Sequence, residues 1–343
     1  MRRLLNVLFV TSQGAYLHRE RESVVVKVEG EIRARVPIHT LEGIICFGQV
    51  SVSPPLMGLC AERGVTISFL SLNGRFWARV QGPVCGNVLL RRNHYRQADS
   101  PMTSAQIAQA IITAKLNNSR SVLQRHLRNH SSNDGADIVS EAITHLNELL
   151  QALKTPQSLA TIRGIEGEAA RRYFQAFNHL ILIQKDDFFF TERSRRPPLD
   201  NMNALLSFAY TLLVHDVSSA LESVGLDPAV GFLHQDRSGR PGLALDLMEE
   251  LRPYLADRLV LSLVNLKQVT AGGFEKTETA AVNMTDETRR KVITTYQERK
   301  REEIIHPFLK EKIEIGLLPY VQALLLARHI RGDINGYPPF LWR

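Results

Sequence analysis

Two different spacings of hydrophobic residues divide the chain. Up to about residue 82, short apolar runs alternate with polar residues and are separated by glycines, which is typical of β-strands. From about Ser104, apolar residues recur three and four positions apart, which predicts helices as far as about Arg331. The sequence therefore predicts an α+β protein with a small β-domain containing one helix over 1–96, followed by an all-α domain over 97–343.

The boundaries of the expected elements come from the same pattern. The expected strands are Leu4–Thr11, Ser23–Val28, Glu31–Ile38, Ile44–Phe47, Thr66–Leu70 and Phe76–Val80. The expected helix among them is Pro54–Arg63, and Pro83–Asp99 is expected to be a linker. A polar break at Asn129–Asp137 and a polar loop at Thr270–Asp286 are expected to separate helices.

Charge is distributed unevenly along the 343 residues. Residues 1–96 carry 13 Lys/Arg and 6 Asp/Glu, whereas the rest carries 29 of each, so the whole net charge of +7 lies in the first part. This asymmetry favours an acidic partner or a nucleic acid, although an ordinary solubilising surface has the same composition.

Compartment and membrane association follow from other features. The three cysteines, Cys46, Cys60 and Cys85, are scattered and odd in number, which argues against a disulfide framework or a zinc ribbon and favours a reducing cytoplasm. We expect the basic and apolar start to form a strand rather than a signal peptide. No stretch approaches ~20 uncharged apolar residues, so no membrane span is expected.

The first candidate for chemistry is the segment TIRGIEGEAARRYFQAF, residues 161–177. Its glycines predict a tight turn into a helix with Glu166 at or near the first turn. Glu166, Tyr173 and Phe177 then share one helix face, because residues three to four and seven apart align. Taken alone, Glu166 is better explained as a complement to the helix dipole than as a ligand.

The second candidate is VGFLHQDRSGRPGLALDLMEELRPYL, residues 230–255. His234 follows an apolar run, and the loop after it carries Arg237 and Arg240. A helix then brings three carboxylates into one turn: Asp246, Glu249 and Glu250. Carboxylates about 4 Å apart repel each other by roughly 1–4 kcal/mol, depending on exposure. A divalent cation removes that cost, and oxygen ligands with one imidazole suit Mg²⁺ or Mn²⁺.

A helical-wheel argument separates the three acids. With 100° per residue, Asp246 and Glu249 share the polar face, and Glu250 lies at the border of the apolar face. We therefore expect Glu249 to be essential, Asp246 to contribute in part, and Glu250 to be dispensable. Pro253 removes a backbone hydrogen bond and is expected to loosen the helix at Glu249.

Other signals are weaker or missing. Glu302 and His306 in REEIIHPF are four apart and would meet on a helix, but Pro307 follows at once, and we interpret the segment as a charged helix end. The sequence contains no phosphate-binding loop of the Gly-x-x-x-x-Gly-Lys-Ser/Thr type, no Rossmann glycine motif, no His-Glu-x-x-His and no Gly-x-Ser-x-Gly.

Together these motifs resemble the universal CRISPR-associated integrase family. The resemblance rests on RGIEG, NALLSFAYTLL at 203–213, VGFLH with its basic glycine-containing loop, DLMEELRP and the ending GYPPFLWR. It implies a metal held by Glu166, His234 and Glu249, with Asp246 as a further acid. It also implies DNA insertion by phosphodiester exchange without ATP, a homodimer formed by the β-domains, and a heterohexamer with a small companion protein.

Three functions remain open on the sequence. The first is a metal-dependent DNA endonuclease and integrase with Arg163, Arg237 and Arg240 as DNA-binding candidates. The second is a nucleic-acid-binding scaffold without catalysis, which needs the basic residues but not the acidic ones. The third is a metal-dependent hydrolase of small molecules, which needs the acidic residues but not the charge asymmetry.

Overall fold

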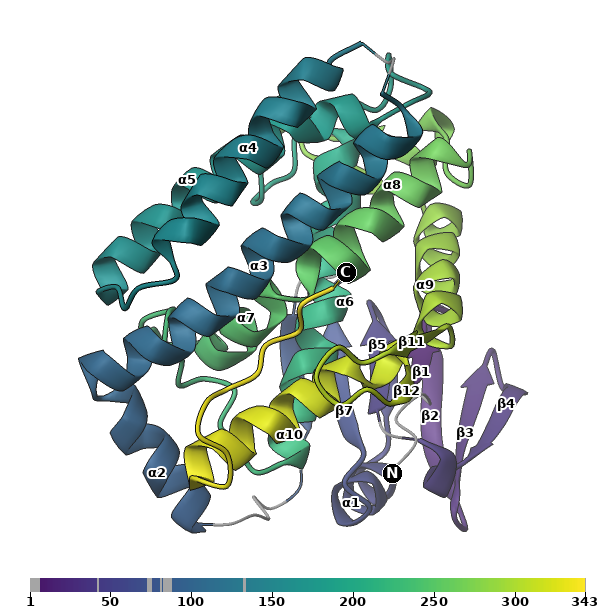
Figure 1. The fold of residues 1–343 in the computed structure, drawn as a ribbon. Coiled ribbons are helices and arrows are strands. Elements are labelled where there is room, and N and C mark those ends of the chain that lie inside the picture. The colour runs from purple at the N-terminus through teal and green to yellow at the C-terminus, as the bar shows by residue number, and fades with distance from the viewer. Residues whose placement is uncertain are drawn as a thin grey trace. The chain divides into compact units, whose positions relative to one another are not determined.

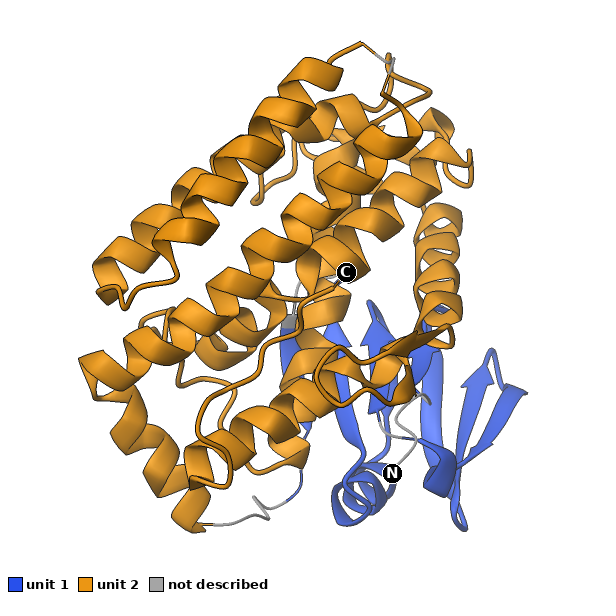
Figure 2. Cartoon of the chain, in the orientation of Figure 1, with its two compact units in different colours: residues 1–87 blue, residues 88–343 orange. Residues whose placement is uncertain are grey.

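The computed structural model divides the chain into two compact units (Figures 1 and 2). Unit 1 is residues 1–87 and unit 2 is residues 88–343. The structure describes residues 7–41, 43–72, 76–80, 82, 88–131 and 134–342. The first residues of the expected strand Leu4–Thr11 and the cysteine at position 85 lie outside the described residues. The α+β class with a β-rich N-terminal part before a helical part is confirmed.

Unit 1 contains short strands and one α-helix. The strands are β1 Val7–Val10, β2 Ala15–Glu20, β3 Ser23–Val28, β4 Glu31–Pro37, β5 Gly43–Phe47, β6 Val50–Val52, β7 Thr66–Leu70 and β8 Phe76–Val80. The helix α1 is Pro54–Glu62, and Ile38–Thr40 forms a 3₁₀ turn. The expected strands are thus confirmed within their described residues. Runs such as Ser23–Val28 (SVVVKV) favour strands because β-branched side chains fit a pleated surface.

The strands form two four-stranded sheets. In the first sheet, of order β1-β5-β7-β8, β5 is parallel to β1 and β7, and β8 is antiparallel. In the second, of order β4-β3-β2-β6, β2 pairs antiparallel with β3 and parallel with β6. The register of β2 and β3 pairs Leu17 with Val26, which directs both side chains to the core.

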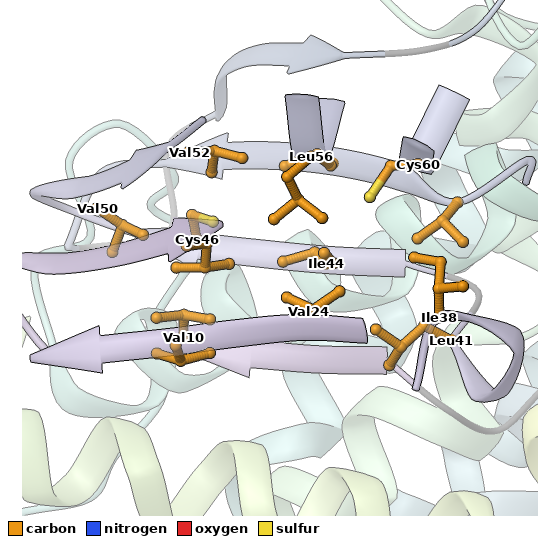
Figure 3. Packing of buried hydrophobic residues seen from close by; sticks show 14 of the residues in the cluster. Val10, Val24, Ile38, Leu41, Ile44, Cys46, Val50, Val52, Leu56 and Cys60 are labelled. Carbon is orange, nitrogen blue, oxygen red and sulfur yellow. The ribbon is translucent and has the colours of Figure 1, made fainter. Parts of the chain in front are cut away.

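Both sheets and α1 enclose one hydrophobic core (Figure 3). Its buried side chains come from strands of both sheets and from the helix, among them Val10, Val24, Ile44, Val52 and Leu56. The edge strand β4 is mostly exposed, including Ile32 at 52%. An exposed edge strand presents unpaired backbone groups to which another chain can bind.

Unit 2 is mainly helical. Its helices are α2 Val88–Ala98, α3 Pro101–Asn129, α4 Ala136–Ala152, α5 Leu159–Phe177, α6 Asn201–Ser223, α7 Gly242–Glu249, α8 Arg258–Asn265, α9 Asp286–Lys300 and α10 Leu318–Arg331. A π-helical segment, Arg252–Asp257, lies between α7 and α8. Two hairpins pair β9 Phe274–Lys276 with β10 Val282–Met284, and β11 Glu303–Ile305 with β12 Lys312–Glu314. The second domain was expected to be all-α, so these short hairpins correct that prediction.

The structure also corrects the prediction that Pro83–Asp99 is a linker. Val88–Ala98 forms α2, which packs against α3 and α10, and residues 83–87 lie outside the described residues. The boundary expected after residue 96 falls inside this helix, whereas the two units divide after Asn87. The many polar residues of α2 gave it a weak helical signal, but His94 is fully buried and bonds the backbone carbonyl of Val230.

The helices of unit 2 pack around α3 and α6. Helix α3 lies beside α4 and α5, and α6 packs against α7, α8, α10 and the π-helical segment (Figure 1). Helix α6 is long and apolar enough to cross a membrane by length and composition, but 67% of its most apolar window is buried inside the unit. We interpret α6 as the central core helix.

Candidate active site

Helix α5 carries Glu166. The helix begins after Ser158, whose hydroxyl accepts a hydrogen bond from the Thr161 amide at 3.2 Å. Because it begins this early, Glu166 lies in the middle of the helix and not at its first turn, which corrects the sequence-based expectation. Tyr173 and Phe177, which lie further along the same helix, are buried.

A close approach of two glycines shapes the loop that carries His234. A Cβ on Gly231 would lie 2.8 Å from the carbonyl carbon of Gly242 and 2.9 Å from a carboxylate oxygen of Asp246. A Cβ on Gly242 would lie 2.7 Å from the Ala229 carbonyl oxygen, which accepts the Gly242 amide at 3.1 Å. Both positions therefore require glycine, and this contact brings the His234 loop onto the start of α7.

Asp246 holds that loop with its carboxylate. It accepts backbone N–H groups from Phe232, Leu233 and His234 at 2.6, 2.9 and 3.0 Å. Its Oδ1 also lies 2.6 Å from Nδ1 of the His234 ring. A donor at Nδ1 leaves Nε2 as the ring nitrogen with a lone pair, so Asp246 orients His234 for binding through Nε2.

Glu249 is the last residue of α7, and the π-helical segment follows it. Glu249 is 3% exposed, and Asp246 and Glu250 are fully buried. The helical wheel predicted a polar face for Asp246 and Glu249 and an apolar border for Glu250, but all three acids are buried. Glu250 accepts hydrogen bonds from Tyr337, Gln322 and the Phe340 amide, which lie in α10 and the C-terminal segment.

Lys115 of α3 links Glu166 of α5 to Glu249 of α7. Its ammonium nitrogen lies 2.5 Å from a carboxylate oxygen of Glu166 and 2.7 Å from one of Glu249. Arg252 adds an ion pair to the other oxygen of Glu249 at 2.7 Å. Burial alone would raise the pKa of Glu249, but the charges of Arg252 and Lys115 outweigh it and lower that pKa to about 2. Glu249 is therefore ionised at neutral pH.

The pocket beside Glu166 contains both charged and aromatic side chains. Its polar lining residues are Lys115, Ser119, Glu166, Tyr173, Arg193, Arg195, Tyr210, Arg252 and Asp257. On one side of the pocket, the carboxylate of Asp257 accepts the hydroxyls of Tyr210 at 2.6 Å and Tyr173 at 3.0 Å. Burial raises the pKa of Asp257 to about 6, although the two hydroxyl bonds oppose the rise.

The chemistry of the donors fits a divalent cation. Glu166 and Glu249 share the ammonium group of Lys115, so a cation already lies where a metal with oxygen ligands would bind. Within the described ranges, no three His, Cys, Asp or Glu side chains converge on one ligand position. Lys115 thus occupies the place between the two carboxylates.

The three arginines expected to bind DNA differ in their surroundings. Arg163 donates two hydrogen bonds, of 3.1 and 2.7 Å, to the carbonyl of Leu233, so it ties α5 to the His234 loop. Arg237 is exposed and Arg240 is half-buried, in the turn where the Arg240 amide bonds the Arg237 carbonyl. Of the three arginines, Arg237 and Arg240 therefore remain candidates for binding a DNA phosphate at the surface.

Glu302 and His306 do not lie on one helix, so they do not meet as two ligands. Helix α9 ends at Lys300, and His306 follows strand β11, fully buried, with its Nε2 at 2.9 Å from Oε1 of Gln322. His306 is therefore a packed core histidine. The sequence analysis did not identify Lys115 or Arg252. The available signals were weak: Lys115 is a single lysine among the apolar residues of α3, and Arg252 lies three positions after Glu249.

Comparisons with known proteins agree with this architecture. The family model "CRISPR associated protein Cas1" matches residues 8–298. A curated protein of Chlorobaculum tepidum, "CRISPR-associated endonuclease Cas1 1", is 52% identical over 343 residues, covering 100% of both chains. One of Rhodospirillum rubrum, "CRISPR-associated endonuclease Cas1 2", is 50% identical over 351 residues, again covering 100% of both chains.

Solved structures share the fold. A CAS1 protein from Thermotoga maritima matches with a TM-score of 0.80 and 22% identity, over 95% of this chain and 97% of that one. A casposase bound to integration product matches with a TM-score of 0.82 and 21% identity, over 98% and 94%. At these identities the likeness concerns the fold alone.

Proposed function

Because this chain belongs to the Cas1 family of CRISPR-associated proteins, we propose that it is a metal-dependent DNA endonuclease and integrase. The observation that carries the proposal is the pair of carboxylates, Glu166 and Glu249, that share one cation beside His234. The curated relatives are named endonucleases, and a casposase of the same fold was solved with its integration product.

In this proposal Glu166, Glu249 and Nε2 of His234 hold Mg²⁺ or Mn²⁺. The bound metal supplies a Lewis acid that polarises a phosphate oxygen and stabilises the leaving oxygen. Asp246 keeps the His234 ring in its binding orientation through the Nδ1 contact. Arg252 keeps Glu249 ionised, so that a negative ligand is present at neutral pH.

The pocket next to Glu166 suits a phosphodiester. Arg193 and Arg195 line it and supply positive charge, and the guanidinium carbon of Arg193 lies 5.4 Å from the ring centre of Tyr210. For strand transfer, a 3′-hydroxyl loses its proton and forms a new P–O bond, while the old P–O bond breaks and its oxygen leaves as a hydroxyl. With water as the attacking group, the same step is hydrolysis.

The partners we propose are DNA, a second copy of the chain and a small companion protein. One chain of a structure titled "Cas6-RT-Cas1--Cas2 complex" matches with a TM-score of 0.83 and 22% identity, over 100% of this chain and 36% of that one. We propose that the chain dimerises through unit 1, where the exposed edge strand β4 requires a cover, and that the dimers join the companion in a heterohexamer. We place this assembly in the cytoplasm, with no membrane attachment.

The test is strand transfer in vitro. Supercoiled plasmid carrying a CRISPR repeat and short DNA fragments are incubated with the protein and Mn²⁺ or Mg²⁺, with and without chelator. We expect nicked and joined products only with metal, and none from Glu166→Gln. The matched control is Glu168→Gln on the same helix, whose carboxylate bonds Arg171 and Arg172 at the surface.

The two alternative functions give different results in the same test. A scaffold binds the DNA without forming any product. A small-molecule hydrolase does not bind DNA at all. Full activity in excess chelator would exclude the metal.

A further inference from the structure

Three arginines from three separate helices of unit 2 act on one another through their charges, and two of them lie over aromatic rings. They are Arg125 of α3, Arg258 at the start of α8 and Arg299 of α9. The guanidinium carbon of Arg258 lies 5.0 Å from the ring centre of Tyr254 and 4.5 Å from that of Trp342. That of Arg299 lies 5.9 Å from the Tyr254 ring. We call these three residues the arginine triad.

The arginine triad lacks the acidic partners that other buried cations in this unit have. Lys115 and Lys300 are paired with carboxylates at 2.5–2.8 Å. In the part of the chain that the structure describes, none of the three triad guanidinium groups forms an ion pair with a carboxylate. The Nε of Arg299 is buried without a hydrogen-bond partner among these residues.

The charges of the triad act on one another. Burial lowers the pKa of Arg258 to about 10, and the charges of Arg299 and Arg125 act in the same direction. Burial and the charge of Arg125 also lower the pKa of Arg299, although Glu302 opposes this. Partly buried cations that repel each other are costly unless an anion compensates them.

An anion with several acceptor oxygens fits this arrangement best. Guanidinium groups donate in a planar fork that matches phosphate oxygens, and their stacking on Tyr254 and Trp342 fixes the direction of the fork. Arg125 is exposed, and Arg258 and Arg299 are half-buried, so the group is open to solvent. A strand of DNA supplies such an anion at every nucleotide.

We propose that the arginine triad is a second phosphate-binding site, which takes a backbone phosphodiester of the DNA away from the reacting one. None of the triad residues lines the pocket beside Glu166. The π-helical segment connects the two places, because Arg252 at its start faces that pocket and Arg258 directly follows its end. The site rests on the proposed function in that it requires DNA as the ligand.

The test compares the double variant R125Q/R299Q with the control R290Q/K291Q. The control removes two charges from exposed positions of α9. DNA binding is measured by fluorescence anisotropy with chelator, over a range of salt concentrations. We expect the triad variant to bind roughly 10-fold or more weakly and the slope of log K against log salt to fall by roughly 1–2, since each lost phosphate contact lowers it by about 0.9.

Thermal unfolding separates binding from folding. R125Q/R299Q removes charge repulsion and no ion pair, but it also removes the contacts of Arg299 with the Tyr254 ring and carbonyl. We therefore expect its melting temperature to stay close to that of the wild type. R258K keeps the charge and loses the fork, so we expect it to weaken binding as well. Equal affinity and equal salt slope for the triad variant and the control would overturn the site.

Nicking by the same preparations distinguishes the two proposals. If the wild type binds and nicks DNA and the triad variant behaves like the control, only the second phosphate site fails. If the wild type neither binds nor nicks DNA with Mn²⁺, the proposed function fails, and the second phosphate site fails with it.

Discussion

The Nδ1 atom of His234 lies 2.6 Å from Oδ1 of Asp246, and the same carboxylate binds the backbone amides on the His234 side of the loop. Asp246 therefore has no oxygen left without a donor, and it is a positioning residue for His234. Such partners of a metal-binding histidine typically change metal affinity 10–100-fold when replaced.

We expect Asp246→Asn to weaken Mn²⁺ binding by about that factor, because an amide nitrogen would face backbone N–H groups. The measurement is Mn²⁺ titration followed by thermal unfolding and by plasmid nicking. Asp236→Asn, an exposed acid of the same loop, is the control and should leave both curves unchanged. Identical titrations for the two variants would contradict the role of Asp246.

A methyl group at Gly231 tests how closely the loop must pack. The new Cβ would lie 2.7 Å from the His234 carbonyl oxygen and 2.9 Å from the Asp246 carboxylate. We expect Gly231→Ala to lower the melting temperature and the response to Mn²⁺ together. Gly58→Ala in α1, where a Cβ meets nothing within 4 Å, should stabilise or leave stability unchanged. A fully active Gly231→Ala protein would argue against the packing.

Sequence reasoning was most accurate where the local pattern alone decides the structure. The expected strands Ser23–Val28, Thr66–Leu70 and Phe76–Val80 match β3, β7 and β8 in their bounds. The loosening expected at Glu249 from Pro253 corresponds to the end of α7 and the π-helical segment. These features depend on side-chain period and on the missing proline amide.

The roles of the three acids of α7 were harder to predict from the sequence than the strands were. The helical wheel describes one helix against solvent, but α7 is covered on all sides, so Asp246, Glu249 and Glu250 differ by their partners. Those partners, such as Lys115, are distant in sequence. No local pattern gives such pairings, because they depend on how the helices pack.

Lys115 tests whether the two carboxylates form a cation site. The substitution Lys115→Met leaves Glu166 and Glu249 without their shared cation. Losing one partner of a buried ion pair typically lowers the free energy of unfolding by about 3–5 kcal/mol. We expect the melting temperature to fall without metal and Mn²⁺ to restore it, with a larger shift than in the wild type.

The control for this experiment is Lys300→Met. Lys300 forms a comparable buried pair with Asp216, at 2.8 Å, and among the described residues it has no second carboxylate that could complete a metal site. It should lose stability that Mn²⁺ does not restore. If Mn²⁺ shifted both variants equally, the exchange of Lys115 for a metal would be refuted.

Glu250 connects α7 to the end of the chain. Its carboxylate accepts the Phe340 amide at 2.8 Å and the Tyr337 hydroxyl, and all three residues are buried. The sequence-based expectation was that Glu250→Ala retains activity. The structure leads us to expect a loss of stability of about 2–4 kcal/mol instead, because buried donors are left without an acceptor. Denaturant unfolding measures this, with the exposed Glu287→Ala as control.

The pH dependence of stability tests Asp257. Burial raises its pKa from 3.8 to about 6, so between these values the unfolded chain releases a proton that the folded chain keeps. The contribution of Asp257 to stability is therefore complete below about pH 4 and is lost as the pH rises through 6, by about 3 kcal/mol. Asp257→Asn does not titrate, so we expect it to gain that amount relative to the wild type between pH 4 and 7. Urea unfolding at several pH values measures this difference in the free energy of unfolding, and the exposed Asp99→Asn is the control. If the curves of free energy against pH for Asp257→Asn and the wild type were parallel, Asp257 would not titrate in this range.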